Sequence, residues 1–226
     1  MCCEACSNLG LSESVRLVMH IYSLRSDAGI AGQRRCGIVS QAEQLGLAIP
    51  LLRGLARAHP RNHPLALELW DSGIHDARLL ATFVENPQQI TRGQMEAWVR
   101  AADNWALTDA LAFLCDCTEF AEEKAHAWSA RKGEFVKRTG FAVMAGMAVH
   151  RKELPDEIFL RFLPVIAREA ADGRNFVKKA VSWALRQIGK RNPALRRAAV
   201  AEAKRIAQID SRAARWIAAD ALRELA

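Results

Sequence analysis

Residues 175–193 of the chain read NFVKKAVSWALRQIGKRNP, and this stretch decides the fold. At 3.6 residues per turn, its apolar residues fall on one stripe: Val177, Val181, Ala184 and Ile188. A second face carries residues that follow one another at i, i+4, i+7 and i+11: Lys179, Trp183, Arg186 and Lys190. The spacing therefore predicts an amphipathic helix that ends near Asn192-Pro193.

This pattern places Trp183 on the basic face and not on the core stripe. A neighbouring helix that packed on the same side would still bury the indole. Trp183 is therefore either a packing residue or a side chain presented to a ligand.

The rest of the chain also reads as helix. Ala, Leu and Arg are abundant, and no stretch alternates with period two for long. Pro, Gly and Asn interrupt the chain at intervals and leave segments of roughly 12–20 residues, a length that suits paired antiparallel helices.

Short sequence matches recur at spacings near 40 residues. Phe135-Val136-Lys137 returns 41 residues later at 176–178, and Ala184-Leu185-Arg186 returns 37 residues later at 221–223. Such spacings are typical of HEAT- and armadillo-type helix pairs. We therefore predict an all-α fold, an α-solenoid of HEAT-like antiparallel helix pairs that is curved and has a basic concave face. Residues 31–226 would form this single domain. Residues 1–30 would be an N-terminal segment whose sequence is compatible with a helix but predicts no definite structure.

Positive charge is concentrated in the C-terminal part of the chain. Residues 1–130 carry 11 Lys and Arg against 15 Asp and Glu, whereas residues 131–226 carry 21 against 10. Between Gly173 and Ala201 there are eight basic residues and no acidic one. This asymmetry favours a polyanionic partner such as nucleic acid over the alternative of a solvated helix face.

Several classes of protein are not expected. No segment approaches ~20 consecutive apolar residues, and the N-terminus has no basic region followed by an apolar stretch, so we expect a cytoplasmic protein without a membrane contact. Cys3-x-x-Cys6 has no second ligand pair at zinc-like spacing, so we predict neither a metal site nor a cofactor. The six histidines show no spacing typical of a catalytic triad.

Two further candidates lie off the core stripes of their helices. In residues 104–115, Trp105 and Asp109 lie one turn apart, opposite the apolar stripe. Asp103 or Asn104 is the expected N-cap, so Asp109 is not needed for capping. The alternative is a surface carboxylate beside a half-buried Trp.

Arg138 is the candidate in the helix expected over residues 134–147. It lies opposite a stripe formed by Val136, Gly140, Val143 and Met147, where we expect an exposed side chain. An exposed Arg is usually only a solvated residue, but beside a duplex it would bind phosphate.

These stretches resemble the DNA alkylation repair enzyme family, the HEAT-like-repeat alkylpurine DNA glycosylases. The resemblance runs from about Arg35 to the C-terminus. It rests on residues 46–57, 67–81, 104–109, 134–138 and, most specifically, 175–193.

The resemblance implies roles for individual residues. The two active-site tryptophans of the family would be Trp105 and Trp183, its carboxylate Asp109, and its phosphate-contacting Arg would be Arg138. The chain departs from the family at Ala106, where many members have Asp directly after the first Trp. The basic residues expected to grip DNA are Lys178, Lys179, Arg186, Lys190 and Arg191.

The resemblance also implies a reaction, the removal of N3- and N7-alkylated purines from duplex DNA during base excision repair. An alkylated purine is cationic and leaves as a neutral base, so no general acid is required. Asp109 would stabilise the positive charge that develops on the deoxyribose. We expect a monofunctional hydrolase of N-glycosyl bonds that acts as a monomer.

Two alternatives stay open. One is a non-catalytic HEAT-repeat protein that binds damaged or branched DNA, which would bind without releasing a base. The other is a protein-interaction scaffold, which would show no salt-dependent affinity for DNA.

Overall fold

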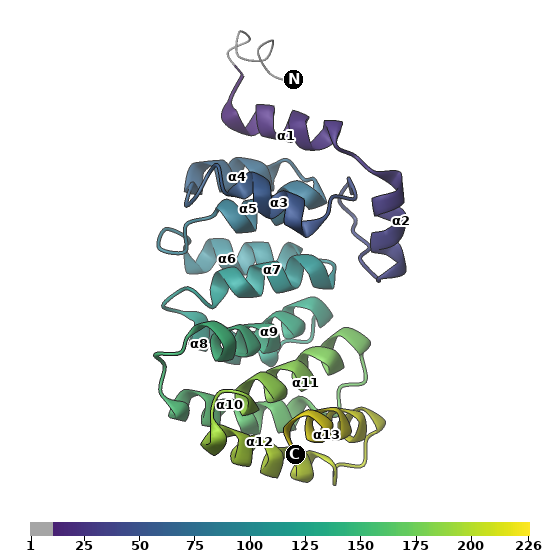
Figure 1. Cartoon of the computed structure of the whole chain (residues 1–226), viewed down its shortest axis with the longest axis vertical. Coiled ribbons are helices and arrows are strands. Elements are labelled where there is room, and N and C mark those ends of the chain that lie inside the picture. Colours follow the sequence, from purple (N-terminus) through teal and green to yellow (C-terminus); the bar gives the residue numbers. More distant parts are fainter. Residues whose placement is uncertain (1–10) are drawn as a thin grey trace. The chain divides into compact units, whose positions relative to one another are not determined.

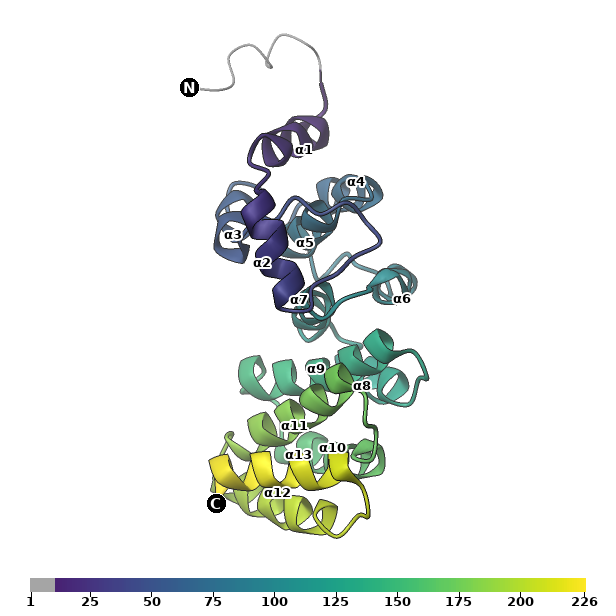
Figure 2. The ribbon, with the colours of Figure 1, turned by 90° about the vertical axis from the view of Figure 1, so that its right-hand side faces the viewer.

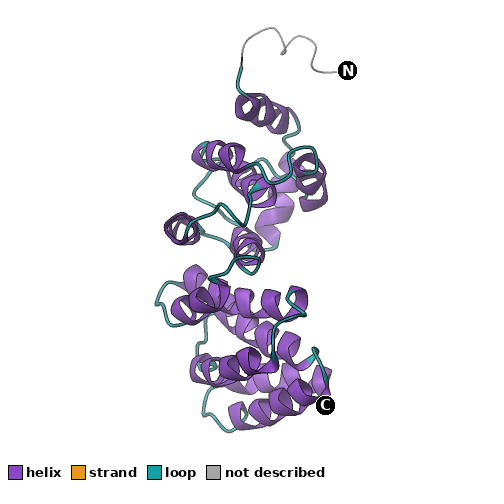
Figure 3. Cartoon of the chain, turned by 90° about the vertical axis from the view of Figure 1, so that its left-hand side faces the viewer, coloured by secondary structure: helices purple, strands orange, loops and turns teal. Residues whose placement is uncertain are grey.

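The computed structural model describes residues 11–226, and this part of the chain is helical throughout, as expected (Figures 1 and 3). Its only β feature is an isolated bridge between Glu43 and Ile74. The Cys3-x-x-Cys6 motif lies outside the described residues. Among the helices that are described, none is long and apolar enough to cross a membrane.

The helices gather into two compact units, one that ends at Thr91 and one that spans Arg92–Ala226. The first unit contains α1 (Glu13–Ser23), α2 (Asp27–Arg35), α3 (Ile49–Ala56), α4 (His63–Asp71) and α5 (His75–Val84). The second contains α6 (Arg92–Ala101), α7 (Trp105–Cys115), α8 (Ala121–Ser129), α9 (Glu134–His150), α10 (Asp156–Glu169), α11 (Asn175–Gly189), α12 (Pro193–Ile206) and α13 (Arg212–Leu225). The division falls between α5 and α6, so the helices α1 and α2 belong with α3–α5.

A buried carboxylate organises the first unit. Asp76, at the start of α5, is fully buried and accepts hydrogen bonds from the backbone N–H groups of Leu45 and Leu47 at 2.7 and 2.8 Å. Gly46 between them has φ +76°, and a Cβ there would collide with the backbone of α2. The turn therefore needs glycine, and it joins α2 to α5.

The second unit is a stack of helical hairpins, the HEAT-like arrangement that the repeat spacing predicts. Helices α9, α11 and α13 pack in succession, and α8, α10 and α12 pack against one another as a second layer (Figure 2). The repeated motif residues meet directly, because the Phe135 and Phe176 rings lie 5.6 Å apart. The stripe expected in 175–193 is buried, since Val177, Val181, Ala184 and Ile188 have no exposed surface.

Side-chain caps set where several helices of this stack begin. Asn104 accepts hydrogen bonds from the N–H groups of Ala106 and Leu107, so it is the N-cap of α7, one of the two residues expected for that role. Asn192 caps α12 in the same way through the N–H of Leu195, with Pro193 as the first helical residue. Asp109 is thus left free of any capping role.

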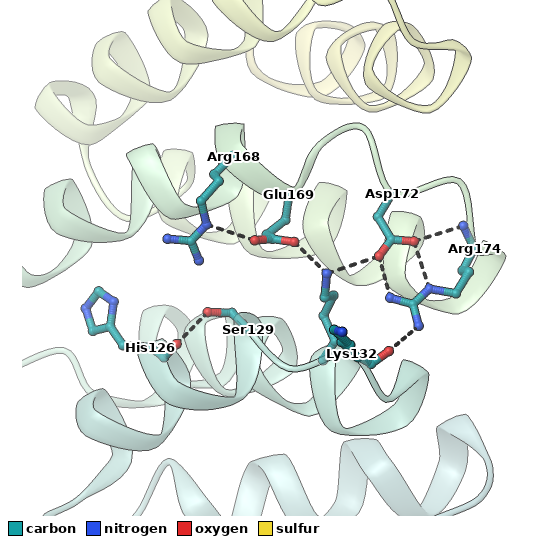
Figure 4. Close-up of polar contacts among 8 residues, drawn as sticks. His126, Ser129, Lys132, Arg168, Glu169, Asp172 and Arg174 are labelled. Atoms are coloured by element: carbon teal, nitrogen blue, oxygen red, sulfur yellow. Dashed lines mark hydrogen bonds and ion pairs between the residues drawn. The ribbon is translucent and has the colours of Figure 1, made fainter.

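An ion-pair network ties α9 to the end of α10 and the loop that follows (Figure 4). The Lys137 ammonium contacts Glu169 at 2.5 Å and Asp172 at 3.3 Å. Arg174 pairs with Asp172 and also donates to the carbonyl of Lys132 at 2.7 Å. The hydrogen bonds from Arg174 lower the pKa of Asp172 to about 2, so this carboxylate stays ionised at neutral pH.

Helix α9 is buried on nearly all sides from Arg138 to Ala148, because it packs against α7, α8 and α11. The expectation that Arg138 is exposed was therefore wrong, since 7% of the residue is accessible. Gly140 makes the close packing possible. A Cβ at Gly140 would lie within 3 Å of the backbone of Trp128 and Ser129 in α8.

We predict that Gly140→Ala destabilises the protein by about 1–3 kcal/mol, because the added methyl group meets backbone atoms that cannot rotate away. Thermal unfolding of the full chain measures the effect. Gly173→Ala is the matched control, since a Cβ at Gly173 would meet nothing within 4 Å. Equal melting temperatures for the two variants would contradict the packing described for α8 and α9.

Candidate functional site

The centre of the candidate site is an ion pair between α7 and α9. Arg138 donates from Nε to Oδ1 of Asp109 at 2.9 Å and from Nη2 to Oδ2 at 2.8 Å. Its remaining nitrogen, Nη1, donates to the carbonyl of Phe176 in α11 at 2.8 Å. One guanidinium group therefore connects three helices, in the two-pronged geometry that holds a carboxylate most firmly.

The carboxylate of this pair is the more accessible partner. The Asp109 side chain is 19% exposed, against 8% for Arg138. Burial raises the pKa of Asp109, and the charge and hydrogen bonds of Arg138 oppose that rise. Arg138 thus favours the ionised form of a carboxylate that its surroundings would otherwise neutralise.

A surface pocket of about 390 Å³ opens over this pair. It is lined by Asp109, Arg138, Lys179, Trp183, Arg186, Trp216 and Asp220. All of these residues belong to the second unit and come from four helices, α7, α9, α11 and α13. The lining combines two indoles with three basic and two acidic side chains, which suits a ligand that has both flat apolar parts and charge.

The internal repeats explain why these residues converge. The 41-residue spacing relates Arg138 of α9 to Lys179 of α11, and the 37-residue spacing relates Lys179 to Trp216 of α13. The same 37-residue step relates Trp183 to Asp220. Since α9, α11 and α13 pack in succession, equivalent positions lie on the same edge of the stack.

Trp183 is half-buried, and α7 supports it. The ring of Phe113 meets the Trp183 indole edge-on, with 5.9 Å between centroids. Phe113 lies one turn after Asp109 on α7, so the helix that carries the carboxylate also positions the indole. The sequence pattern placed Trp183 off the core stripe. In the structure, this residue packs against α7 on one side and lines the pocket on the other.

Trp105 is the one candidate of the four that does not line this pocket. It is the first residue of α7, is half-buried, and lies one turn before Asp109. Ala106, the departure from the family pattern, occupies the first turn, where its N–H is satisfied by the Asn104 cap. The structure therefore keeps Trp105 near the site on the same helix without making it part of the pocket wall.

Four of the five predicted DNA-contacting residues lie at the pocket or beside it, in different environments. Lys179 is exposed at the pocket. The Lys178 ammonium lies over the Trp216 ring, 4.7 Å from its centroid. Arg186 pairs with Asp220 at 3.2 Å and with Glu224, and Lys190 pairs with Glu224 as well.

Arg191 serves the fold and lies apart from the pocket. Its guanidinium donates to the carbonyls of Ala148 at 3.0 Å and Leu154 at 3.1 Å, and it stacks on the Phe159 ring at 3.9 Å. These contacts join α9, α10 and the end of α11. A count of charges along the sequence cannot distinguish such an Arg from one that faces a ligand.

Trp216 and Asp220 are pocket residues that sequence reasoning missed. Both belong to α13, where they lie one turn apart beside the buried stripe of Ala213, Ile217 and Ala221; Asp220 is itself buried, whereas Trp216 is exposed. The 37-residue repeat carried the signal, because it aligns these two positions with the basic face of α11.

Comparisons with known proteins place this arrangement in a family. A solved structure described as "a new family of proteins related to the HEAT-like repeat DNA glycosylases with affinity for branched DNA structures" superposes with a TM-score of 0.76. The match covers 95% of this chain and 96% of that one at 17% sequence identity, so it shows the likeness of the fold. A search of curated protein sequences found no significant match.

The family model for the DNA alkylation repair enzyme matches residues 19–225, which include every helix that lines the pocket. The helical stack and the match over most of the chain agree, and this chain belongs to the DNA alkylation repair enzyme family.

Proposed function

We propose that the protein is a monofunctional DNA glycosylase that removes cationic N3- and N7-alkylated purines from duplex DNA by hydrolysis of the N-glycosyl bond. The observation that carries this proposal is the Asp109 carboxylate, held by Arg138 at an open pocket with indole walls. The pocket is built by one unit of one chain, so a monomer suffices.

The chemistry needs little from the protein. Alkylation at N3 or N7 gives the purine a positive charge, and the base leaves neutral, so a second, protonated carboxyl group is not required. Positive charge moves onto the deoxyribose as the bond breaks. A fixed anion next to the sugar stabilises that transition state more than the ground state, which is what accelerates the step.

The geometry at Asp109 supports this proposal. Two carboxylate oxygens offer about four lone-pair sites, and Arg138 uses two of them. The remaining sites can accept a hydrogen bond from the attacking water or face the cationic sugar. Trp183 would add the negative face of its indole, worth ~0.5–2 kcal/mol for a nearby cation.

The exposed basic side chain at the pocket is Lys179, and it suits the phosphates that flank the lesion. Lys178, Arg186 and Lys190 already contact an indole or carboxylates within the protein. Their charge still contributes to the field over the pocket, but DNA would have to compete with these partners for direct contacts.

We predict that the wild-type protein releases free 7-methylguanine and 3-methyladenine from methylated duplex DNA, and that Asp109→Asn lowers the single-turnover rate by ~10²- to 10³-fold. The substitution keeps the shape of the side chain and removes its charge. Chromatography of the released bases measures the rate.

The matched control is Asp210→Asn, which removes the same charge from a fully exposed side chain. It should leave the rate unchanged. If the wild-type protein binds DNA but releases no base, the glycosylase proposal is wrong and the protein is a non-catalytic DNA-binding protein. Equal release by wild type and Asp109→Asn would remove Asp109 from the centre of the reaction.

Arg138→Gln should shift the pH dependence of base release. Burial raises the pKa of Asp109 and Arg138 opposes the rise, so its loss moves the pKa further up. The reaction needs the ionised carboxylate, so activity is lost as pH falls through this pKa. We predict a rate about 10- to 100-fold below wild type at neutral pH, with a deficit that narrows as pH rises.

Single-turnover rates between pH 6 and 9 measure this effect, with Arg161→Gln as control. Arg161 is an exposed Arg that also pairs with a carboxylate, Glu122, but in a different part of the second unit. A deficit of the same size at every pH would contradict a role for Arg138 in keeping Asp109 ionised.

A further inference from the structure

The first unit contains a pocket of its own, of about 750 Å³, which takes no part in the site around Asp109. Its walls are helix α2 and the segment of residues 40–44 that follows. Ile30, Ala31 and Ala42 give it apolar surface, and three arginines and two carboxylates surround that surface. What the pocket can bind therefore depends on which of these charges already have partners.

Hydrogen bonds hold the two walls together. The buried side-chain amide of Gln44 donates to the side-chain oxygen of Gln33 on α2 at 2.8 Å and to the carbonyl of Ile38 at 3.3 Å. The N–H of Ser26, at the start of α2, donates to the carbonyl of Leu45 at 2.9 Å. The pocket is thus preformed, and a ligand does not need to order either wall before it binds.

Both carboxylates of the pocket are paired with the same arginine. Arg25 contacts Asp27 at 3.3 Å and Glu43 at 3.2 Å. Arg34 and Arg35 also line the pocket, are exposed, and have no ion-pair partner within residues 11–226. The unpaired charges at the pocket are therefore both positive.

The end of α2 presents these two arginines on the pocket side of the helix. Arg34 and Arg35 follow Ala31 by three and four residues, so both lie one turn from this pocket residue. Gly37, with φ +76°, ends the helix through a hydrogen bond from its N–H to the carbonyl of Arg34. Basic residues in a last turn stabilise the helix itself, but that effect does not require two of them to line one pocket. Adjacent guanidinium groups with unused N–H donors are well suited to phosphate oxygens.

We propose that Arg34 and Arg35 form a phosphate-binding site in the first unit, and that the backbone of bound DNA supplies the phosphate. This site goes beyond the proposed function, because it uses neither Asp109 nor the release of a base. Phosphate contacts carry no base specificity, so the site adds affinity for any duplex and makes that affinity depend more steeply on salt. A small phosphate compound would offer the same chemistry, and the experiment distinguishes the two sources.

The test measures the Kd of the full chain for an unmodified DNA duplex between about 50 and 200 mM NaCl. We expect the slope of log Kd against log [NaCl] to fall by about one in Arg34→Gln or Arg35→Gln and by about two in the double variant, which should also raise the Kd roughly tenfold. Arg16→Gln removes an exposed arginine of α1 that does not line the pocket, and it should leave the slope unchanged.

Ala31→Glu separates loss of the site from damage to the fold. The added carboxylate lies three and four residues before the two arginines, so it can pair with both along α2 and should maintain or raise the melting temperature. It should still weaken DNA binding as the double variant does, because the arginines then have a partner within the protein. A lower melting temperature with unchanged DNA binding would contradict the proposal.

Inorganic phosphate, added to the wild-type protein and the double variant during thermal unfolding, distinguishes the sources. Phosphate that stabilises only the wild type, with unchanged DNA binding in the double variant, keeps the site and overturns DNA as its source. No phosphate effect together with an unchanged salt slope overturns the site. A reduced slope in the double variant supports the DNA contact, and it does so even where the wild-type protein releases no base and the glycosylase proposal fails.

Discussion

The buried ion pair between Asp109 and Arg138 is the contact on which the rest of the site depends. Without a cationic partner, burial would favour the neutral form of this carboxylate. Without an anion, a buried Arg would lower the stability of the fold. The charge and hydrogen bonds of Arg138 oppose the rise that burial gives the pKa of Asp109. Because the same guanidinium reaches the carbonyl of Phe176, the pair also joins α7, α9 and α11 beneath the pocket. One interaction thus supplies both the anion that the proposed reaction needs and the connection between the three helices.

The fold was largely readable from the sequence, because apolar stripes and a repeat near 40 residues are local signals. They predicted the buried stripe of α11, and the repeated phenylalanines do contact one another. The burial of Arg138 was not readable in this way. Periodicity describes the faces of one helix, whereas α9 is enclosed by neighbouring helices, chiefly α7, α8 and α11, and small residues such as Gly140 allow close approach. Its partner Asp109 was identified as an off-stripe carboxylate and by the family resemblance, but without its ion pair.

Several basic residues of the C-terminal sequence that were predicted to contact DNA instead have partners within the protein. Arg191 binds backbone carbonyls, and Arg186 and Lys190 bind carboxylates of α13. Much of the positive charge therefore holds the helical stack together, and Lys179 is the exposed basic residue at the pocket. The sequence also predicted only part of the aromatic surface of the site. It missed Trp216, which becomes a pocket residue only when α13 packs beside α11. Repeat alignment would have indicated it.

The central claim is that the Asp109 carboxylate stabilises positive charge on a deoxyribose. The most direct measurement compares the affinity of the protein for two duplexes, one with a cationic pyrrolidine in place of the sugar at an abasic site and one with a neutral tetrahydrofuran. The account predicts that wild-type protein binds the cationic duplex at least about tenfold more tightly and that Asp109→Asn loses this preference. Equal affinity of the wild-type protein for the two duplexes would contradict it.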